Sequence, residues 1–351
     1  MRWKPRRQAW TQYPLRSPAH LNWALLGLRE GPPNLQLVAA VLTWLITGST
    51  VASLNKWIFA VHNFRYPLLL SSLHMLAAIL VDYPLLRLGL VRPGAGEDGT
   101  LTAHARLRVF LLSLSFCASI AFGNVGLNYV QLSFVQTVST TTPLFTLALS
   151  KMLLGTRHHI LKYTAMLPIC LGASFSIIGE VQFHHTGCFF LLLSTFLRGL
   201  KTVQQSSLLK EERINAVTLL YLMSVPSFCI LFIAALALEN RAVWEALHGQ
   251  DNALWLFILL SCLASVLYNL TSFWVIALTS AVTIHVLGNL TLVGNLFLSQ
   301  LLFGSQLTVL SYIGIALTLA GMCLYHNCDL IAGSLSSRKT LLRRDRNTKS
   351  K

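Results

Sequence analysis

Two basic residues, Arg198 and Lys201, lie about midway along one apolar stretch of the chain, and a third, Lys56, lies in another. Arg198 and Lys201 are three residues apart, so a helix places them on one face. A cation at the centre of a membrane-spanning helix costs about 2.5–3.5 kcal/mol on insertion scales. No acidic residue lies deep in any apolar stretch, so the compensating charge has to come from a ligand. The three cations therefore indicate binding of an anionic, phosphorylated substrate.

The alternative for each of these cations is a structural one. A long basic side chain can extend along its helix until the charge reaches the lipid headgroups. Lys56 lies near the end of its apolar stretch, so this alternative applies to it most easily. The sequence leaves both interpretations open.

Further polar side chains fall inside apolar stretches and are expected to contact the sugar or base of the substrate. For each of them, a hydrogen bond between two helices is the alternative interpretation. They are Asn124, Asn269, His285, Asn289 and Thr291.

The composition is that of a polytopic membrane protein. Of 351 residues, 54% are apolar and only 11% are charged, and the mean hydropathy is +0.61. Soluble chains carry about 25% charged residues. A helix that spans a bilayer needs about 20 mostly apolar residues. The sequence predicts ten such helices, at about 35–61, 67–87, 108–127, 133–154, 163–180, 187–209, 216–238, 253–275, 281–303 and 307–326.

The second five stretches resemble the first five. The segment 49–56 aligns with 194–201, which matches Lys56 to Lys201, and 136–155 aligns with 285–304. Gly172 aligns with Gly314 in the same order. Because five is odd, the second half would cross the membrane in the opposite sense, as in transporters with inverted repeats. We therefore expect an all-α fold of two inverted five-helix repeats, at 35–180 and 187–326, between basic tails at 1–34 and 327–351.

Two positions at matching depth in these repeats are expected to bend. Pro143 removes the helical hydrogen-bond donor for the carbonyl of Ser139, and Ser139 aligns with Gly288. Ser139, Pro143 and Gly288 are therefore candidate gating bends. Kinks that serve packing alone are the alternative.

The formal net charge of +15 is distributed unevenly over the two sides of the predicted membrane. One side, which includes both tails, holds 22 of the 27 Lys and Arg residues, and the other side holds 2. Cytosolic loops carry such an excess, so both termini are expected in the cytosol. The basic tails then face anionic lipid, and a nucleic-acid partner is not expected.

Several motifs together resemble one known family. They are "NK" with "FRYPLLLSSLHM" (residues 55–75), "TTTPLF" (140–145), "IIGEVQFHHTG" (177–187), "GNLT" with "LLFG" (288–304) and "GIALTLAGMCLYH" (314–326). The chain resembles the drug/metabolite transporter superfamily in its triose-phosphate and nucleotide-sugar translocator branch, and within it the E subgroup of solute carrier family 35. The resemblance covers about residues 35–327.

This resemblance implies ten helices and obligate exchange of phosphorylated sugars or nucleotide sugars, in the Golgi or endoplasmic reticulum of animals. The family's lysine in the first span corresponds to Lys56. Its basic residues in the ninth span are replaced by Thr291 and Leu292, and its lysine and glutamate in the fourth span by Ser139 and Thr142. A phosphate group would therefore depend more on Arg198 and Lys201.

The sequence thus predicts an antiporter that works by alternating access in the Golgi or another endomembrane, with an anionic substrate and counter-substrate. No metal or cofactor is expected. An enzyme is not expected either, because no nucleophile and base occur at a useful spacing. The alternatives are a carrier of a neutral or cationic metabolite with the same fold, and a membrane scaffold that transports nothing.

Overall fold

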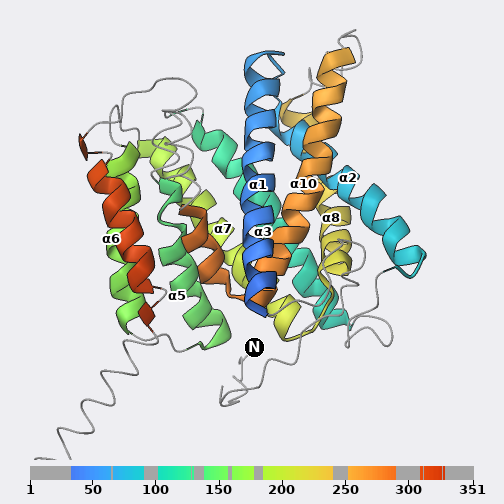
Figure 1. Cartoon of the computed structure of the whole chain (residues 1–351). Helices are drawn as coiled ribbons and strands as arrows, with labels where there is room; N and C mark the ends of the chain where they lie inside the picture. Colours follow the sequence, from blue (N-terminus) through green and yellow to red (C-terminus); the bar gives the residue numbers. More distant parts are fainter. Residues whose placement is uncertain are drawn as a thin grey trace, which may run out of the picture.

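The computed structural model describes residues 33–64, 66–90, 102–127, 129, 138–156, 160–177, 185–239, 252–289, 309–310, 312–325 and 327–328. This part of the chain is helical apart from turns and short connections. The helices labelled in Figure 1 are α1 (Pro33–Ala60), α2 (Pro67–Arg87), α3 (Ala103–Leu127), α5 (Thr142–Leu154), α6 (Ile160–Ile177), α7 (His185–Lys210), α8 (Ala216–Leu238) and α10 (Asn252–Leu278). Two further helical segments cover 281–289 and Tyr312–Tyr325.

The expected all-helical membrane protein is confirmed. Within the described ranges, 6 helices are long and apolar enough to cross a bilayer, namely Leu35–Phe59, Pro67–Arg87, Ala103–Gly126, His185–Lys210, Ala216–Leu238 and Ala253–Leu278. Within the described residues, shorter apolar helical stretches cover Thr142–Leu154, Ile160–Gly172 and Tyr312–Tyr325. The described part of the ninth predicted span is the segment 281–289.

Local sequence signals set the helix ends. Pro67 begins α2, where its fixed φ suits a first turn and its missing N–H is not needed. Asn215 precedes α8, and its Oδ1 accepts a hydrogen bond of 3.0 Å from the N–H of Val217. At the end of α5, Gly155 adopts a φ of +62°, the left-handed conformation that glycine tolerates at a helix C-terminus.

The long helices pack as pairs that join distant parts of the chain. Helix α1 lies beside α10 in the middle of Figure 1, while α3 lies beside α7 and α2 beside α8. The contact between α3 and α7 is reciprocal, because Ser194 Oγ donates to Ser119 O at 2.7 Å and Ser119 Oγ donates to Ser194 O at 3.2 Å. Small residues with hydroxyl groups allow helices to approach closely in lipid.

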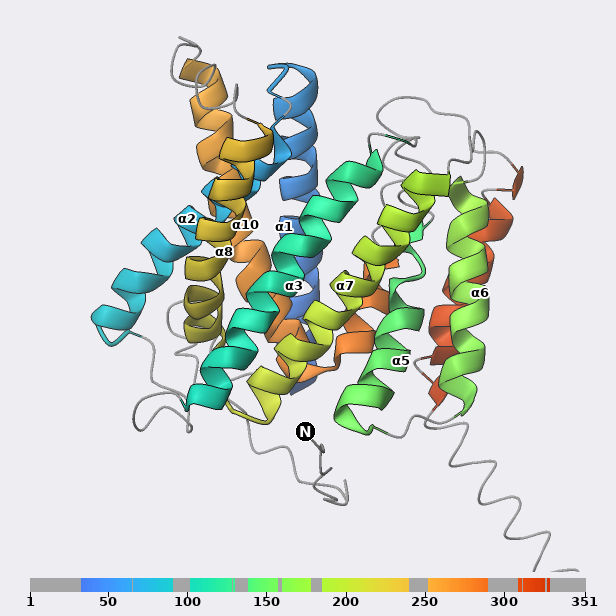
Figure 2. The same ribbon diagram turned by 180° about the vertical axis from the view of Figure 1, so that it is seen from behind.

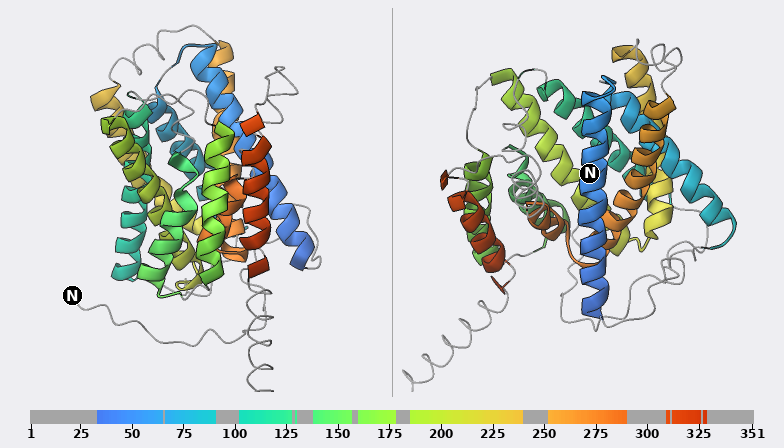
Figure 3. Two further views of the ribbon diagram at one scale, coloured as in Figure 1. Left: turned by 90° about the vertical axis from the view of Figure 1, so that its left-hand side faces the viewer. Right: turned by 45° about the horizontal axis from the view of Figure 1, so that its top comes forward.

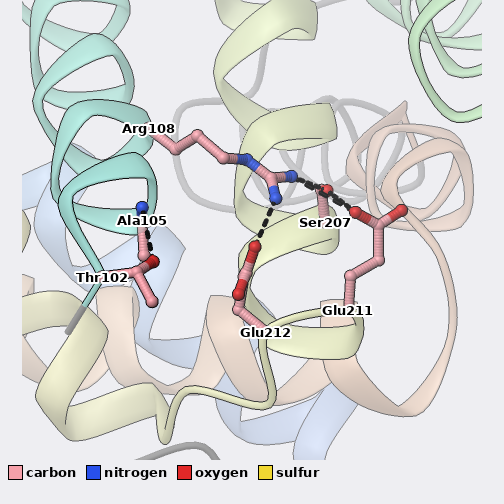
Figure 4. Close-up of polar contacts among 6 residues, drawn as sticks. All are labelled: Thr102, Ala105, Arg108, Ser207, Glu211 and Glu212. Carbon is pink, nitrogen blue, oxygen red and sulfur yellow. Dashed lines mark hydrogen bonds and ion pairs between the residues drawn. The ribbon is translucent and has the colours of Figure 1, made fainter. Parts of the chain in front are cut away.

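An ion-pair network joins α3 to the end of α7 (Figure 4). Arg108 lies 2.8 Å from Glu212 and 3.3 Å from Glu211, and it also donates to Ser207. Ser207 Oγ in turn donates to Glu211 at 2.5 Å. At the start of α3, Thr102 Oγ1 accepts a hydrogen bond from the N–H of Ala105. The network fixes α7 at one of its ends.

The end of α8 is bound to the start of α2 by Glu239. Its two carboxylate oxygens accept hydrogen bonds of 2.9 Å from the N–H groups of Leu68 and Leu69. Burial raises the pKa of Glu239, and these two hydrogen bonds act in the opposite direction. The carboxylate thereby satisfies backbone donors that a helix leaves free in its first turn.

Helix α6 packs against Tyr312–Tyr325 on the side of the molecule that lies farthest from α2 (Figure 3, right). A Cβ atom added at Gly172 would lie 2.5 Å from Thr318 N and 2.6 Å from Gly314 O. Both neighbours are backbone atoms, which cannot move aside without shifting a helix. The contact therefore requires glycine at position 172.

We predict that Gly172→Ala lowers the thermal stability of the purified protein, because its methyl group overlaps the backbone of the neighbouring helix. The expected loss is about 1–3 kcal/mol, as for other overpacked sites. Leu171→Ala is the matched control, since Leu171 is adjacent in α6 and is 53% exposed. Equal melting temperatures for Gly172→Ala and the unaltered protein would contradict this packing.

Candidate substrate-binding site

A cavity of about 250 Å³ lies between α1, α5, α7, α10 and the segment 281–289. Its lining combines cationic, amide, hydroxyl and aromatic side chains. The lining residues are Trp44, Ser139, Thr142, Arg198, Lys201, Thr202, Gln205, Tyr268, Asn269, Ser272, Phe273, Ile276, Ile284, His285, Gly288 and Asn289.

One face of α7 supplies much of the polar lining. Arg198, Lys201, Thr202 and Gln205 are spaced at i, i+3, i+4 and i+7, which places all four on the side of α7 that faces the cavity. Close packing between α7 and α5 keeps α7 in this orientation. A Cβ atom at Gly199 would lie only 3.0 Å from Thr146 Oγ1 of α5.

The two cations of this face have no acidic partner in the described part of the chain. The ion pairs found there involve Arg108, and neither Arg198 nor Lys201 lies within 4 Å of a described carboxylate. Lys201 Nζ lies 5.0 Å from the centre of the Phe116 ring, which stabilises the ammonium group only partly. The cavity is therefore electropositive.

His285 faces the same cavity from the segment 281–289. Its Nε2 lies 3.0 Å from Thr202 Oγ1, and Thr202 Oγ1 donates its hydrogen to Arg198 O at 3.0 Å. A hydroxyl group has a single hydrogen, so Thr202 accepts a hydrogen bond from His285 Nε2–H. In the neutral ring this arrangement leaves Nδ1 as an acceptor. His285 and Thr202 thus join the segment 281–289 to α7.

An aromatic wall from α1 and α10 also lines the cavity. The rings of Trp44 and Tyr268 are stacked, with centroids 6.3 Å apart and an angle of 17° between their planes. Asn269 follows Tyr268 and donates from Nδ2 to Ser265 O at 2.9 Å, so this donor is already used within α10. The wall offers an apolar surface opposite polar groups, the combination that small-molecule sites commonly show.

The expected bend at Pro143 takes the form of a helix start. Residues 138–139 are helical, 140–141 form a turn, and α5 begins at Thr142 with Pro143 in its first turn. The carbonyl of Ser139 does lose its helical donor, but Thr142 Oγ1 donates to it at 2.5 Å. Asn289 Nδ2 reaches the next carbonyl, that of Thr140, at 3.4 Å. The break thus lies on the cavity wall and has its own hydrogen bonds.

The structure brings many of the predicted site residues to this one cavity. Of the candidate binding residues, Arg198, Lys201, Asn269, His285 and Asn289 line it, as do Ser139 and Gly288 of the candidate bends. Their roles in binding and gating stay predictions.

Three other predicted residues are not among the described lining of the cavity. Asn124 does not line the cavity, and its buried Nδ2 has no hydrogen-bond partner among the described residues. Lys56 belongs to α1, but its side chain lies outside the described part of the structure, and Thr291 lies outside it entirely.

The sequence interpretation missed several lining residues. Helical spacing places Thr202 and Gln205 on the same face of α7 as Arg198. The sequence alone could therefore have predicted both as lining residues. Trp44 and Tyr268 carried no such signal, because aromatic residues in an apolar helix also occur in cores and at lipid surfaces.

An all-helical membrane protein with a basic cavity among its helices has the architecture expected of a membrane transport protein. A comparison with known protein families leads to the same class of protein. The chain belongs to the Triose-phosphate Transporter family, which matches residues 35–326. It is therefore a transporter of the drug/metabolite transporter superfamily and not an enzyme.

Relatives of known sequence and structure extend this finding. The chain is 58% identical over 318 residues to human solute carrier family 35 member E4, covering 91% of this chain and 87% of that protein. It is 31% identical over 295 residues to a probable sugar phosphate/phosphate translocator of Arabidopsis thaliana, covering 82% of this chain and 94% of the relative. A solved crystal structure with 16% identity has the same fold, with a TM-score of 0.63 over 86% of this chain and 98% of that one. The resemblance to the E subgroup of solute carrier family 35 is confirmed.

We predict that Thr142→Val destabilises the protein, because it leaves the partly buried carbonyl of Ser139 without a donor. An unsatisfied buried group costs about 1–3 kcal/mol. Thr142→Ser retains the hydroxyl group and should keep the melting temperature of the unaltered protein. If the valine variant melted at the same temperature as the serine variant, the carbonyl would have another donor.

Proposed function

We propose that the chain is a secondary-active antiporter that exchanges anionic phosphorylated metabolites by alternating access. The observation that carries this proposal is the position of Arg198 and Lys201. Both line one cavity, and neither has a carboxylate partner among the described residues. Hydrogen bonds to charged groups stabilise by about 1.5–3 kcal/mol each, so a phosphate between these two side chains would be held firmly.

Exchange follows from the same electrostatics. When the cavity is empty, the two cations remain uncompensated in surroundings of low dielectric constant, which strengthens their repulsion. A bound dianion removes this repulsion. The loaded protein therefore changes between its two open states more easily than the empty protein, so that export of one anion is coupled to import of another.

The volume of the cavity limits the size of the substrate. Sites for drug-sized ligands have volumes of about 300–1,000 Å³. The cavity of about 250 Å³ is slightly smaller, which favours a sugar phosphate over the larger nucleotide sugar. Relatives from Arabidopsis thaliana with 29–31% identity are described as a probable sugar phosphate/phosphate translocator, a UDP-uronic acid transporter and a UDP-galactose transporter, so both substrate classes occur among them.

Contacts between aligned residues support an inverted repeat of ten transmembrane helices. Thr140 aligns with Asn289 and also accepts a hydrogen bond from it, and Gly172 aligns with Gly314 and packs against it. A residue that contacts its own counterpart is expected to lie on a two-fold axis. Helices α1 and α7, which carry the aligned lysines, run in opposite directions in Figure 2.

The pairing of helices has the same symmetry. The contact between α1 and α10 corresponds to that between α7 and α3, and the contact between α2 and α10 corresponds to that between α8 and α3. We further propose that both termini are cytosolic, because the basic residues gather on the side of the tails. Membership of the family supports the further proposal that the protein resides in the Golgi or another endomembrane.

The test is counterflow in liposomes with purified protein, using inorganic phosphate, sugar phosphates and nucleotide sugars as labelled substrates. We predict exchange of at least one of these anions. Arg198→Gln and Lys201→Gln should each reduce the rate at least about tenfold, because each removes a charged hydrogen bond to phosphate.

Lys162→Gln is the matched control, since Lys162 lies on α6 over the ring of Tyr325 and does not line the cavity. Normal counterflow in both cavity variants would contradict the site. Exchange of neutral or cationic metabolites only would favour the other kind of carrier, and absence of any exchange by folded protein would favour a scaffold.

A further inference from the structure

Gln205 is a buried polar residue of the cavity to which the proposed function gives no task. It is only 2% exposed, and its Nε2 has no hydrogen-bond partner among the described residues. An amide donor that is buried without a partner destabilises a protein by about as much as a lost hydrogen bond. A ligand that supplies an acceptor removes this penalty, so the state of Gln205 depends on what occupies the cavity.

The position of Gln205 on α7 sets where such an acceptor must be. Gln205 lies four residues after Lys201 and seven after Arg198, on the face that lines the cavity. At 1.5 Å per residue, its Cα is about 6 Å along the helix axis from that of Lys201. In the proposed function, the phosphate group binds between Arg198 and Lys201, at their height along α7. Gln205 therefore lies about one helical turn away from it.

We infer that Gln205 is a specificity-determining residue that hydrogen-bonds a hydroxyl group of the substrate, about one helical turn from the phosphate. This inference rests on the proposed function. A hydroxyl group can accept from Nε2 or donate to Oε1, so it pairs with the amide in either orientation. Gln205 thus selects phosphate monoesters that carry hydroxyl groups over bare phosphate and over apolar esters.

A site that is built to bind a hydroxyl group discriminates against analogues that lack it, because its polar group is then left unpaired. The Trp44–Tyr268 wall adds apolar contact for the carbon skeleton, and Trp44 Nε1 is a second buried donor without a hydrogen-bond partner among the described residues. A change at Gln205 leaves this second donor in place, so it isolates the part of the discrimination that depends on Gln205.

The experiment compares Gln205→Met with Gln204→Met in the reconstituted full-length protein. Methionine keeps the length of the side chain and removes its hydrogen bonds. Gln204 is the neighbouring residue of the same helix and does not line the cavity. The substrates are a hexose 6-phosphate, propyl phosphate and inorganic phosphate, and the measured quantity is the KM of each in exchange.

We expect Gln205→Met to raise the KM of the hexose phosphate about five- to tenfold, as for loss of one hydrogen bond, while the other two values change less than twofold. Gln204→Met should change none. Equal changes for all three substrates in Gln205→Met, or no change, would overturn the inference.

Gln205→Asn is the second variant, to be used if the methionine variant does not fold. Its shorter side chain cannot bring the amide within reach of the same hydroxyl group. It should therefore show the same selective rise in the KM of the hexose phosphate. An unaltered protein that exchanges none of the three anions would overturn the inference, and it would overturn the proposed function as well only if nucleotide sugars were not exchanged either.

Discussion

The arrangement of the cavity depends on the uncompensated charge of Arg198 and Lys201. Each cation at membrane depth costs about 2.5–3.5 kcal/mol on insertion scales, and no described carboxylate reduces this cost. Natural proteins place such groups where they act, because a purely structural role would be met by an apolar residue at no cost. An anion in the cavity is the simplest source of compensation.

Helix α7 connects this charge to the rest of the fold. Its polar face lines the cavity, it packs closely on α3 and α5, and its last turn is held by Arg108 through Ser207 and Glu211. His285 and Thr202 join it to the segment 281–289. A change in the occupancy of the cavity therefore acts on elements that come from both halves of the chain.

The long apolar helices could be predicted from the sequence, because hydropathy and length alone define a membrane span. Helices α2 and α8 have the expected bounds of 67–87 and 216–238. The break before α5 was predictable from Pro143, but the hydrogen bond from the Thr142 hydroxyl group that serves Ser139 O in its place was not. Side-chain competition of this kind does not change the apolar pattern.

The candidate site was predictable where a residue type is unusual in a membrane. Arg198, Lys201, His285 and Asn289 stood out by type, and helical spacing on α7 would have added Gln205. Trp44 and Tyr268 needed the structure, because the pairing of α1 with α10 brings their rings together. Asn124 shows the limit of type alone, since an amide in an apolar helix does not have to face a cavity.

The most direct measurement of the central claim is the melting temperature of the purified protein in phosphate and in chloride at equal ionic strength and pH. A dianion that binds between Arg198 and Lys201 stabilises the folded state in proportion to the logarithm of its concentration above the Kd. The account predicts a higher melting temperature in phosphate, which keeps rising with the logarithm of the phosphate concentration above the Kd. The same melting temperature in both salts over the whole range would contradict it.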